Sequence, residues 1–557
     1  MEPPVEPPPY APGTTTRTIR RAATARTGTV APYRVLADGP GEPHTVRTDL
    51  VPERAPEPGG SVVLRAVHLT DLQIADLTSP ARVEFLQELE GTPGLRLMLP
   101  AYRPQEFLAL HGAEAMIRTL RDPVAAGGPI DLVLTTGDNT DSAQANELRT
   151  WLDLLTGAAP IDPARGAGGL DATPSAVRGG AYWNPEPGPA DVWKRERGFP
   201  DVPGLLAEAA RPFRPAGLAV PWLACFGNHD TLVQGRAPTT PALERLVRGA
   251  AKPVASPLGL PGGDLIDAYR LDPTVVSGGA SRPVRPDPGR RHVGVAEYVR
   301  AHLEAGGDPA GHGFTAANAA DGTGYYVYDA VPGVRLICLD TTNPGGYADG
   351  SLGARQAAWL TDRLAEVHGP GADRAVVLFS HHGLSTLTNG VPPADPAERT
   401  AADLPRLLAP DVERLLHRFP NVVAWVSGHT HVNRVTPRPG PGGGFWEIST
   451  SSLAEWPVQG RRLELGTAGP GIVVLRSTSL DSAAPADPAD GHGLWRLAAL
   501  HREAAANEPG SVGGPAAHGT PADRNVDLLV GVPVALTDAL TGAGRPWNGP
   551  YGATTAR

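Results

Sequence analysis

Several residue types are scarce in this sequence, and each scarcity excludes a class of protein. Among the 557 residues there are only two cysteines, Cys225 and Cys338, and both lie within apolar segments. A disulfide framework is therefore excluded, and both cysteines are expected to be small buried residues. Lysine is equally scarce, since Lys194 and Lys252 are the only ones, and the net charge is −10. Because non-specific nucleic-acid binding needs a basic surface, this charge argues against a nucleic-acid partner.

Long hydrophobic runs are missing as well. No stretch of about 18 apolar residues occurs, so no membrane span is expected. Arg17, Arg20 and Arg21 precede no apolar segment of the kind that a secretion signal needs. We therefore expect a cytoplasmic protein. The alternative is export, if a longer native N-terminus carries a twin-arginine signal.

The length and the distribution of glycine and proline divide the chain into three parts. A chain this long is expected to hold a large core with insertions or a second domain. Residues 1–60 are rich in proline, glycine and threonine and are expected to form an extended N-terminal segment. A core domain is expected over residues 61–476, with insertions at about 156–217 and 232–323, followed by a C-terminal appendage over 477–557. The insertions are expected either to wall a substrate pocket or only to cover apolar surface.

Strand-like and helical patterns alternate in the first part of this core. Residues 62–69 are mostly β-branched and apolar, which is typical of a buried strand, and 131–136 are expected to form the next strand. Residues 105–121 and 143–155 carry apolar side chains at helical spacing, and a further helix is expected at 295–304. The alternation of strands and helices predicts an α/β layered fold.

Five apolar segments end abruptly in polar residues, several of them beside a glycine. Strand ends of this kind are where α/β folds bind ligands and metals. The polar residues that follow the five segments are Asp71 and Gln73 after 62–69, Asp138 after 132–136, Asn228, His229 and Asp230 after 222–226, His381 after 375–380, and His429 and His431 after 422–427.

Oxygen and imidazole donors in this combination are typical of a site for two divalent metal ions. Two ions about 3.5–4 Å apart need one carboxylate that bridges them, together with further ligands on each side. Asp138 is the natural bridge. The remaining ligands are expected to be Asp71, Gln73 and His431 for one ion, and Asn228, His381 and His429 for the other.

Taken in chain order, the motifs Asp-x-Gln, Gly-Asp-Asn, Gly-Asn-His-Asp, His and Gly-His-Thr-His resemble those of the calcineurin-like metallophosphoesterases. The resemblance covers roughly residues 62–453 and identifies 61–476 as a metallophosphoesterase domain. It implies a four-layer α/β/β/α sandwich of two mixed sheets flanked by helices, with long loop insertions. It also implies direct attack of a water activated by the metal pair, with His229 stabilising the developing charge or protonating the leaving group and Asp230 orienting His229.

Gln73 departs from the pattern of most of that superfamily, in which a histidine stands at this position. The sequence is closer there to a subset with Asp-x-Gln, such as the manganese-dependent ADP-ribose/CDP-alcohol diphosphatases. An amide oxygen is a harder ligand than imidazole, so Mn²⁺ is expected, with Fe, Zn²⁺ or Mg²⁺ as alternatives. A second interpretation is that Gln73 only hydrogen-bonds a water held by the metal.

The main hypothesis is a metal-dependent phosphoesterase that hydrolyses a phosphodiester or a diphosphate of a small-molecule substrate. One alternative is a non-catalytic metal-binding scaffold of the same fold, and the intact His229-Asp230 pair argues against it. Another is a nuclease, against which the acidic net charge counts. Nothing in the sequence indicates an oligomeric state.

Overall fold

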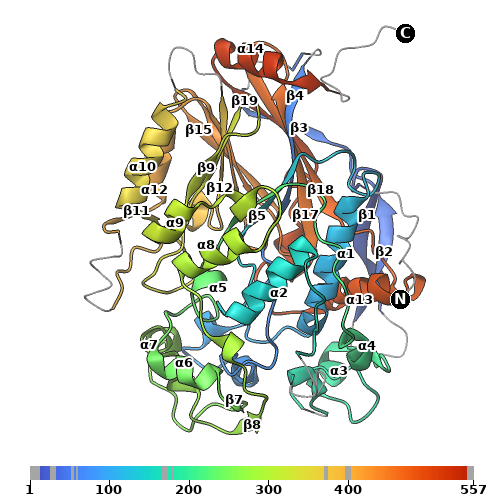
Figure 1. The fold of residues 1–557 in the computed structure, drawn as a ribbon. Helices are drawn as coiled ribbons and strands as arrows, with labels where there is room; N and C mark the ends of the chain where they lie inside the picture. Colours follow the sequence, from blue (N-terminus) through green and yellow to red (C-terminus); the bar gives the residue numbers. More distant parts are fainter. Residues whose placement is uncertain are drawn as a thin grey trace.

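Two β-sheets form the centre of the molecule. The computed structural model describes residues 13–25, 33–51, 56–57, 60–165, 173–178, 180–368, 374–394 and 403–547. Within these residues the two sheets lie face to face, and helices cover their outer surfaces (Figure 1). The predicted four-layer arrangement of two mixed sheets flanked by helices is confirmed.

The larger sheet has eight strands and is parallel on the side that carries the site. On that side β4, β5 and β6 pair in parallel, in that order. The short strand β20 (Arg545–Pro546) pairs with β4 beside the main path. Along the main path the strands are β3 (Thr45–Leu50), β19 (Val526–Gly531), β18 (Ile472–Asp481), β17 (Gln459–Thr467), β4 (Ser61–Leu69), β5 (Leu132–Thr136) and β6 (Trp222–Cys225).

The smaller sheet has six strands and a parallel centre. Strands β10, β12, β14 and β16 run parallel, and β9 and β15 pair antiparallel at the two edges. In spatial order the strands are β15 (Arg434–Gly440), β16 (Gly443–Ser449), β14 (Val422–Ser427), β12 (Ala375–Phe379), β10 (Val334–Cys338) and β9 (Tyr326–Tyr328).

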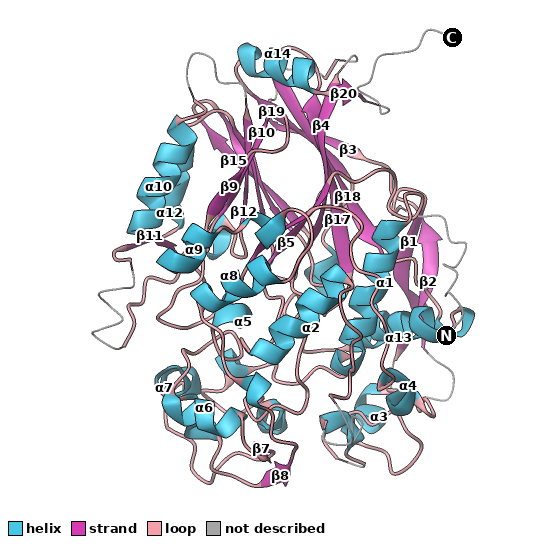
Figure 2. Cartoon of the chain, in the orientation of Figure 1, coloured by secondary structure: helices cyan, strands magenta, loops and turns pink. Residues whose placement is uncertain are grey.

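Alternating side chains of the strands fill two hydrophobic cores. Leu336 and Cys338 of β10 belong to the main core, which they share with strands of the larger sheet. Ile337 between them points the other way, into a second core under α10 (Ala354–Ala365) and α12 (Ala409–Leu416). Successive residues of a strand face opposite sides, so one strand serves both cores. On the face that points away from the smaller sheet, the larger sheet is covered by α1 (Ala109–Arg121), α2 (Ala145–Thr156) and α13 (Gly493–Asn507) (Figure 2).

The expected boundaries at 60 and 476 do not separate the sheet. Strand β3 from the N-terminal segment pairs in parallel with β19 from the C-terminal region, and β19 also pairs with β18. Before them, β1 (Arg17–Ala25) and β2 (Arg34–Pro40) form an antiparallel hairpin. Both ends of the chain therefore contribute to the folded body, and α14 (Val534–Ala543) packs on β4.

The two insertions differ in what they cover. The first contains α3 (Val192–Arg197) and α4 (Leu205–Ala209), and its Trp183 and Trp193 pack with Tyr102 in a separate apolar cluster. It therefore covers apolar surface. The second starts beside α5 (Asn228–Thr231), and its helix α8 matches the expected 295–304. Its other elements are α6 (Pro241–Val247), β7 (Ala251–Pro253), α7 (Leu265–Leu271), β8 (Ser281–Pro283), α8 (Val295–Glu304) and α9 (Ala316–Asp321).

The remaining short strands, β11 (Leu352–Gly353) and β13 (Arg406–Leu407), pair beside α10. None of the helices in the described part of the chain is long and apolar enough to cross a bilayer.

Candidate metal centre

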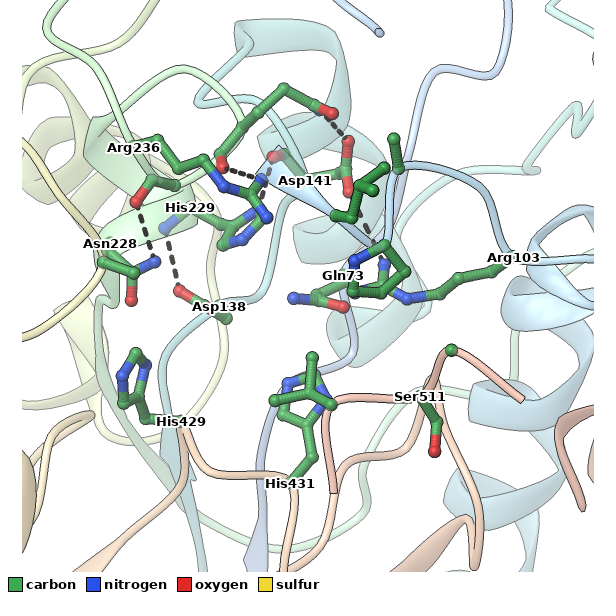
Figure 3. A pocket seen from close by; sticks show the side chains of 18 of the residues that line it. Gln73, Arg103, Asp138, Asp141, Asn228, His229, Arg236, His429, His431 and Ser511 are labelled. Carbon is green, nitrogen blue, oxygen red and sulfur yellow. Dashed lines mark hydrogen bonds and ion pairs between the residues drawn. The ribbon is translucent and has the colours of Figure 1, made fainter. Parts of the chain in front are cut away.

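The seven predicted metal ligands follow the carboxyl ends of five strands, and these ends meet. Strands β4, β5 and β6 belong to the larger sheet, whereas β12 and β14 belong to the smaller one. The loops after them bring side chains from both sheets to one pocket, where Gln73, Asp138, Asn228, His429 and His431 line the wall (Figure 3). The other two predicted ligands contact members of this group, as the distances below show.

Asp71 and His431 form one half of the cluster. His431 Nε2 lies 3.1 Å from Asp71 Oδ1, and both side chains are buried. The second oxygen of Asp71 accepts a hydrogen bond of 3.1 Å from the backbone N–H of His429. On the far side of its ring, His431 Nδ1 lies 2.9 Å from Glu455 Oε2. A carboxylate in this position orients a ligating imidazole and strengthens it as a donor.

Asp138, His381 and His429 form the other half. His381 Nε2 lies 3.3 Å from Asp138 Oδ2 and 3.3 Å from His429 Nδ1. His381 Nδ1 donates a 2.9 Å hydrogen bond to the Thr136 carbonyl, so its Nε2 is the nitrogen left free for a ligand. The two halves join, because Asp71, Asp138 and His381 each offer a ligand atom within 4.8 Å of the others.

Two buried amide oxygens in this pocket have no hydrogen-bond partner among the residues that the structure describes. Gln73 Oε1 and Asn228 Oδ1 are both unsatisfied, although both side chains are almost fully buried. Asn228 is held by its nitrogen, which donates to the Gly235 carbonyl at 3.0 Å. A buried oxygen without a donor is costly, and a cation is a partner that such an oxygen accepts. The residues present therefore fit a pair of divalent ions, with carboxylate, imidazole and amide donors.

Five of the predicted ligands adopt a strained backbone. Asp71, Gln73, Asp138, His429 and His431 have φ values of 53°, 45°, 48°, 66° and 55°, in the left-handed region that non-glycine residues rarely occupy. Each such residue costs of the order of 1 kcal/mol or more, and this cost persists only where the surrounding structure fixes the conformation. Strain of this kind collects at functional sites, and here it falls on the loops that aim the donors.

The charges of the cluster perturb one another strongly. Burial lowers the pKa of His381, but Asp138 and Asp71 outweigh it and raise this pKa to about 9. For His431 burial acts in the same sense, and Glu455 and Asp71 raise its pKa to about 10. Burial raises the pKa of Asp138, yet its histidine neighbours hold this pKa well below the ordinary value. The carboxylates of Asp71, Asp138 and Glu455 thus concentrate negative charge at the site, and nearby cations must balance this charge.

His229 lies at the wall of the same pocket, and its hydrogen-bond partner differs from the predicted one, Asp230. Its Nδ1 donates a 2.6 Å hydrogen bond to the backbone carbonyl of Asp141. The other ring nitrogen, Nε2, takes no part in this bond. Its backbone N–H donates to Asp138 Oδ1 at 2.8 Å. Asp230, expected to orient His229, instead accepts hydrogen bonds from the backbone N–H groups of Gly227 at 2.8 Å and Thr140 at 2.8 Å. The orienting role predicted for Asp230 therefore falls to a backbone carbonyl, and Asp230 holds two ligand loops together.

Four residues at this site lay outside the sequence prediction. Glu455 contacts His431, and Asp349 Oδ1 lies 3.4 Å from His429 Nε2. Arg103 and Arg236 line the pocket beside the predicted ligands (Figure 3). None of the four directly follows an apolar strand, so the pattern that predicts the seven candidate ligands does not predict these residues.

No protein-family model matches the sequence, and no curated protein matches it significantly. Among solved structures, a dimetal phosphatase from Danio rerio matches with a TM-score of 0.32 and 13% identity, over 76% of this chain and 97% of the other. A purple acid phosphatase from yellow lupin (Lupinus luteus) seeds matches with a TM-score of 0.29 and 13% identity, over 77% of this chain and 53% of the other. The sulfate thiohydrolase SoxB of Thermus thermophilus, in complex with glycerol, matches with a TM-score of 0.26 and 17% identity, over 81% of this chain and 61% of the other.

The chain thus spans about half of the lupin protein and three fifths of SoxB. Because the TM-scores and identities are low, this likeness supports no statement about substrate or metal.

Proposed function

We propose that this protein is a dinuclear metal-dependent phosphoric ester hydrolase that acts on a phosphodiester or a diphosphate. The observation that carries the proposal is the convergence of five strand ends from two sheets on one pocket, with two buried amide oxygens left unsatisfied in it. A site with so many aligned donors and so much backbone strain has no evident structural purpose without ions.

The two halves of the cluster indicate which residues would hold each ion. Asp71, Gln73 and His431 would hold one, and Asn228, His381 and His429 the other. Asp138, within 4.8 Å of both Asp71 and His381 through its carboxylate, is the candidate for the shared ligand. When bound, such a pair of ions activates a water as nucleophile and offsets the charge of the phosphoryl oxygens.

The contribution of the chain itself centres on His229. Its Nδ1 is fixed by the Asp141 carbonyl, so the ring presents Nε2 as its remaining polar atom at the pocket wall. A histidine in this position can deliver a proton to the oxygen of the departing group. Gly235 passes close over the ring, since a Cβ there would lie 2.2 Å from His229 Cδ2. The imidazole is therefore held in place on both sides before a substrate arrives.

The choice of ion is proposed to favour Mn²⁺. Gln73 would contribute an amide oxygen at a position where an imidazole would favour zinc. Its Oε1 accepts no hydrogen bond from the described residues and can therefore bind a cation. Fe, Zn²⁺ and Mg²⁺ are the alternatives to be compared.

The test is hydrolysis of bis(p-nitrophenyl) phosphate with added Mn²⁺, Mg²⁺ or Zn²⁺. We expect metal-dependent activity that falls by about 100-fold or more in His229→Ala, the range for loss of a general acid, while metal content is unchanged. His368→Ala, an exposed histidine, is the matched control. A wild-type protein that binds metal yet hydrolyses no member of a phosphoester panel would instead favour the metal-binding scaffold.

A further inference from the structure

Four arginines line the metal pocket, and they differ in how their charge is balanced. Arg82 pairs with Glu84 at 2.6 Å and with Asp141 at 2.7 Å. Arg103 pairs with Glu455 at 2.7 Å. Arg96 is exposed, so water solvates its charge. Arg236, the fourth, has only backbone carbonyls as hydrogen-bond partners among the described residues.

The guanidinium of Arg236 is held rigidly. Its Nε donates to the Leu97 carbonyl at 3.1 Å and its Nη1 to the Gln234 carbonyl at 2.9 Å. The backbone carbonyl of Arg236 accepts a 2.8 Å hydrogen bond from the N–H of Tyr347. A guanidinium has five N–H donors, so these bonds fix its direction and still leave donors for a ligand. Arg236 is half-buried, and the partial removal of its charge from water lowers its pKa, although Asp141 and Asp138 act in the opposite sense.

Arg236 also lies directly beside the proposed chemistry. It follows Gly235, whose carbonyl accepts from Asn228 Nδ2 at 3.0 Å and whose Cα packs against the His229 ring. Figure 3 shows the Arg236 side chain next to His229 at the wall of the pocket. The charge of Arg236 therefore lies beside the residue that is proposed to protonate the leaving group.

We infer that Arg236 binds a second anionic group of the substrate, next to the phosphoryl group that is transferred. The inference rests on the proposed function and narrows it to substrates that carry two adjacent anionic groups. A partly buried cation that pairs with no carboxylate among the described residues keeps part of its desolvation cost, and an incoming anion would offset that cost. The fork of free N–H donors suits the oxygens of a phosphate, which guanidinium groups bind through paired hydrogen bonds.

The test compares two non-hydrolysable probes that differ by one anionic group. Methylenediphosphonate and methylphosphonate are titrated calorimetrically into the metal-loaded protein after free metal has been removed. We expect Arg236→Gln to weaken methylenediphosphonate binding by about 10- to 100-fold, as for loss of a hydrogen bond to a charged group. Methylphosphonate binding should be unchanged, and Arg236→Lys should give an intermediate loss.

Arg245→Gln is the matched control, because Arg245 is an exposed arginine of the same insertion. It should leave both affinities unchanged, and melting temperature and metal content of all variants should equal those of the wild type. Equal weakening of both probes would overturn the inference, because Arg236 would then contact the transferred group. Unchanged binding of both probes would overturn it as well.

The same variants separate this inference from the proposed function. If the wild type hydrolyses phosphoesters but Arg236→Gln shows no selective loss, only the inference fails. If the wild type is inert towards every phosphoester and the selective loss is still measured, the proposed function fails and the inference holds as a binding property.

Discussion

Glu455 joins the proposed metal ligand His431 to the pocket arginine Arg103, so Glu455→Gln perturbs one half of the proposed centre without replacing a proposed ligand. In the structure Glu455 is fully buried, with Oε2 2.9 Å from His431 Nδ1 and Oε1 2.7 Å from Arg103 Nε. Oε2 also accepts a 2.8 Å hydrogen bond from the backbone N–H of Val512. Glutamine keeps the shape and loses the charge.

Two effects of different size follow from these contacts. Loss of a carboxylate behind a ligating histidine typically lowers metal affinity by about 10- to 100-fold, or about 1.4–2.8 kcal/mol. Arg103 also loses its nearest anion, since Asp141 lies 3.9 Å away. Breaking a buried ion pair costs about 3–5 kcal/mol of folding stability. Because glutamine keeps one side-chain oxygen that can accept a hydrogen bond from Arg103, we expect a loss of about 3 kcal/mol.

Calorimetric titration of metal-free protein with Mn²⁺ measures the first effect for each ion separately. The ion that His431 would hold should bind about 10- to 100-fold more weakly in Glu455→Gln. The ion held by His381 and His429 should be little affected, because neither histidine contacts Glu455. Asp527→Asn is the matched control, since Asp527 is a buried carboxylate bonded to Arg476 at 2.8 Å in the larger sheet. Equal weakening of both ions, or no weakening, would refute the division of the centre into two halves.

Two further substitutions test the packing and the choice of ion. Gly428→Ala places a Cβ 2.0 Å from Thr70 Oγ1 and 2.4 Å from Asp71 Oδ2, so we expect loss of metal binding and about 1–3 kcal/mol of stability in urea denaturation. Gly262→Ala meets open space and should change neither quantity. Gln73→His should raise the affinity for Zn²⁺ relative to Mn²⁺ by about 10-fold in competition titrations, and an unchanged ratio would show that residue 73 is no direct ligand.

The convergence of the seven candidate ligands could be predicted from the sequence because each of them follows a buried strand within a few residues. An apolar run that stops at a polar cluster is a local signal, and parallel strands end on the same edge of a sheet. Asp71 after β4 and Asp138 after β5 illustrate this, because the two strands are paired neighbours. The helix at 295–304 could be predicted for the same reason, because the spacing of apolar residues along a helix is also a local signal.

The remaining parts depend on contacts between distant segments. Strand β3 pairs with β19 across almost the whole chain, so composition alone placed both outside the core. Glu455 and Arg236 reach the pocket from loops, where periodicity does not fix the direction of a side chain. The prediction that Asp230 orients His229 follows how carboxylates orient catalytic imidazoles, yet this short carboxylate next to a turn accepts hydrogen bonds from backbone N–H groups instead.

The central claim is that loops from both sheets hold a pair of cations around Asp138. Anomalous diffraction from crystals of the Mn²⁺-loaded protein measures this directly. We predict two peaks, one beside Asp71 and His431 and the other beside His381 and His429, with Asp138 in contact with both. A single peak, or peaks away from these side chains, would contradict the claim.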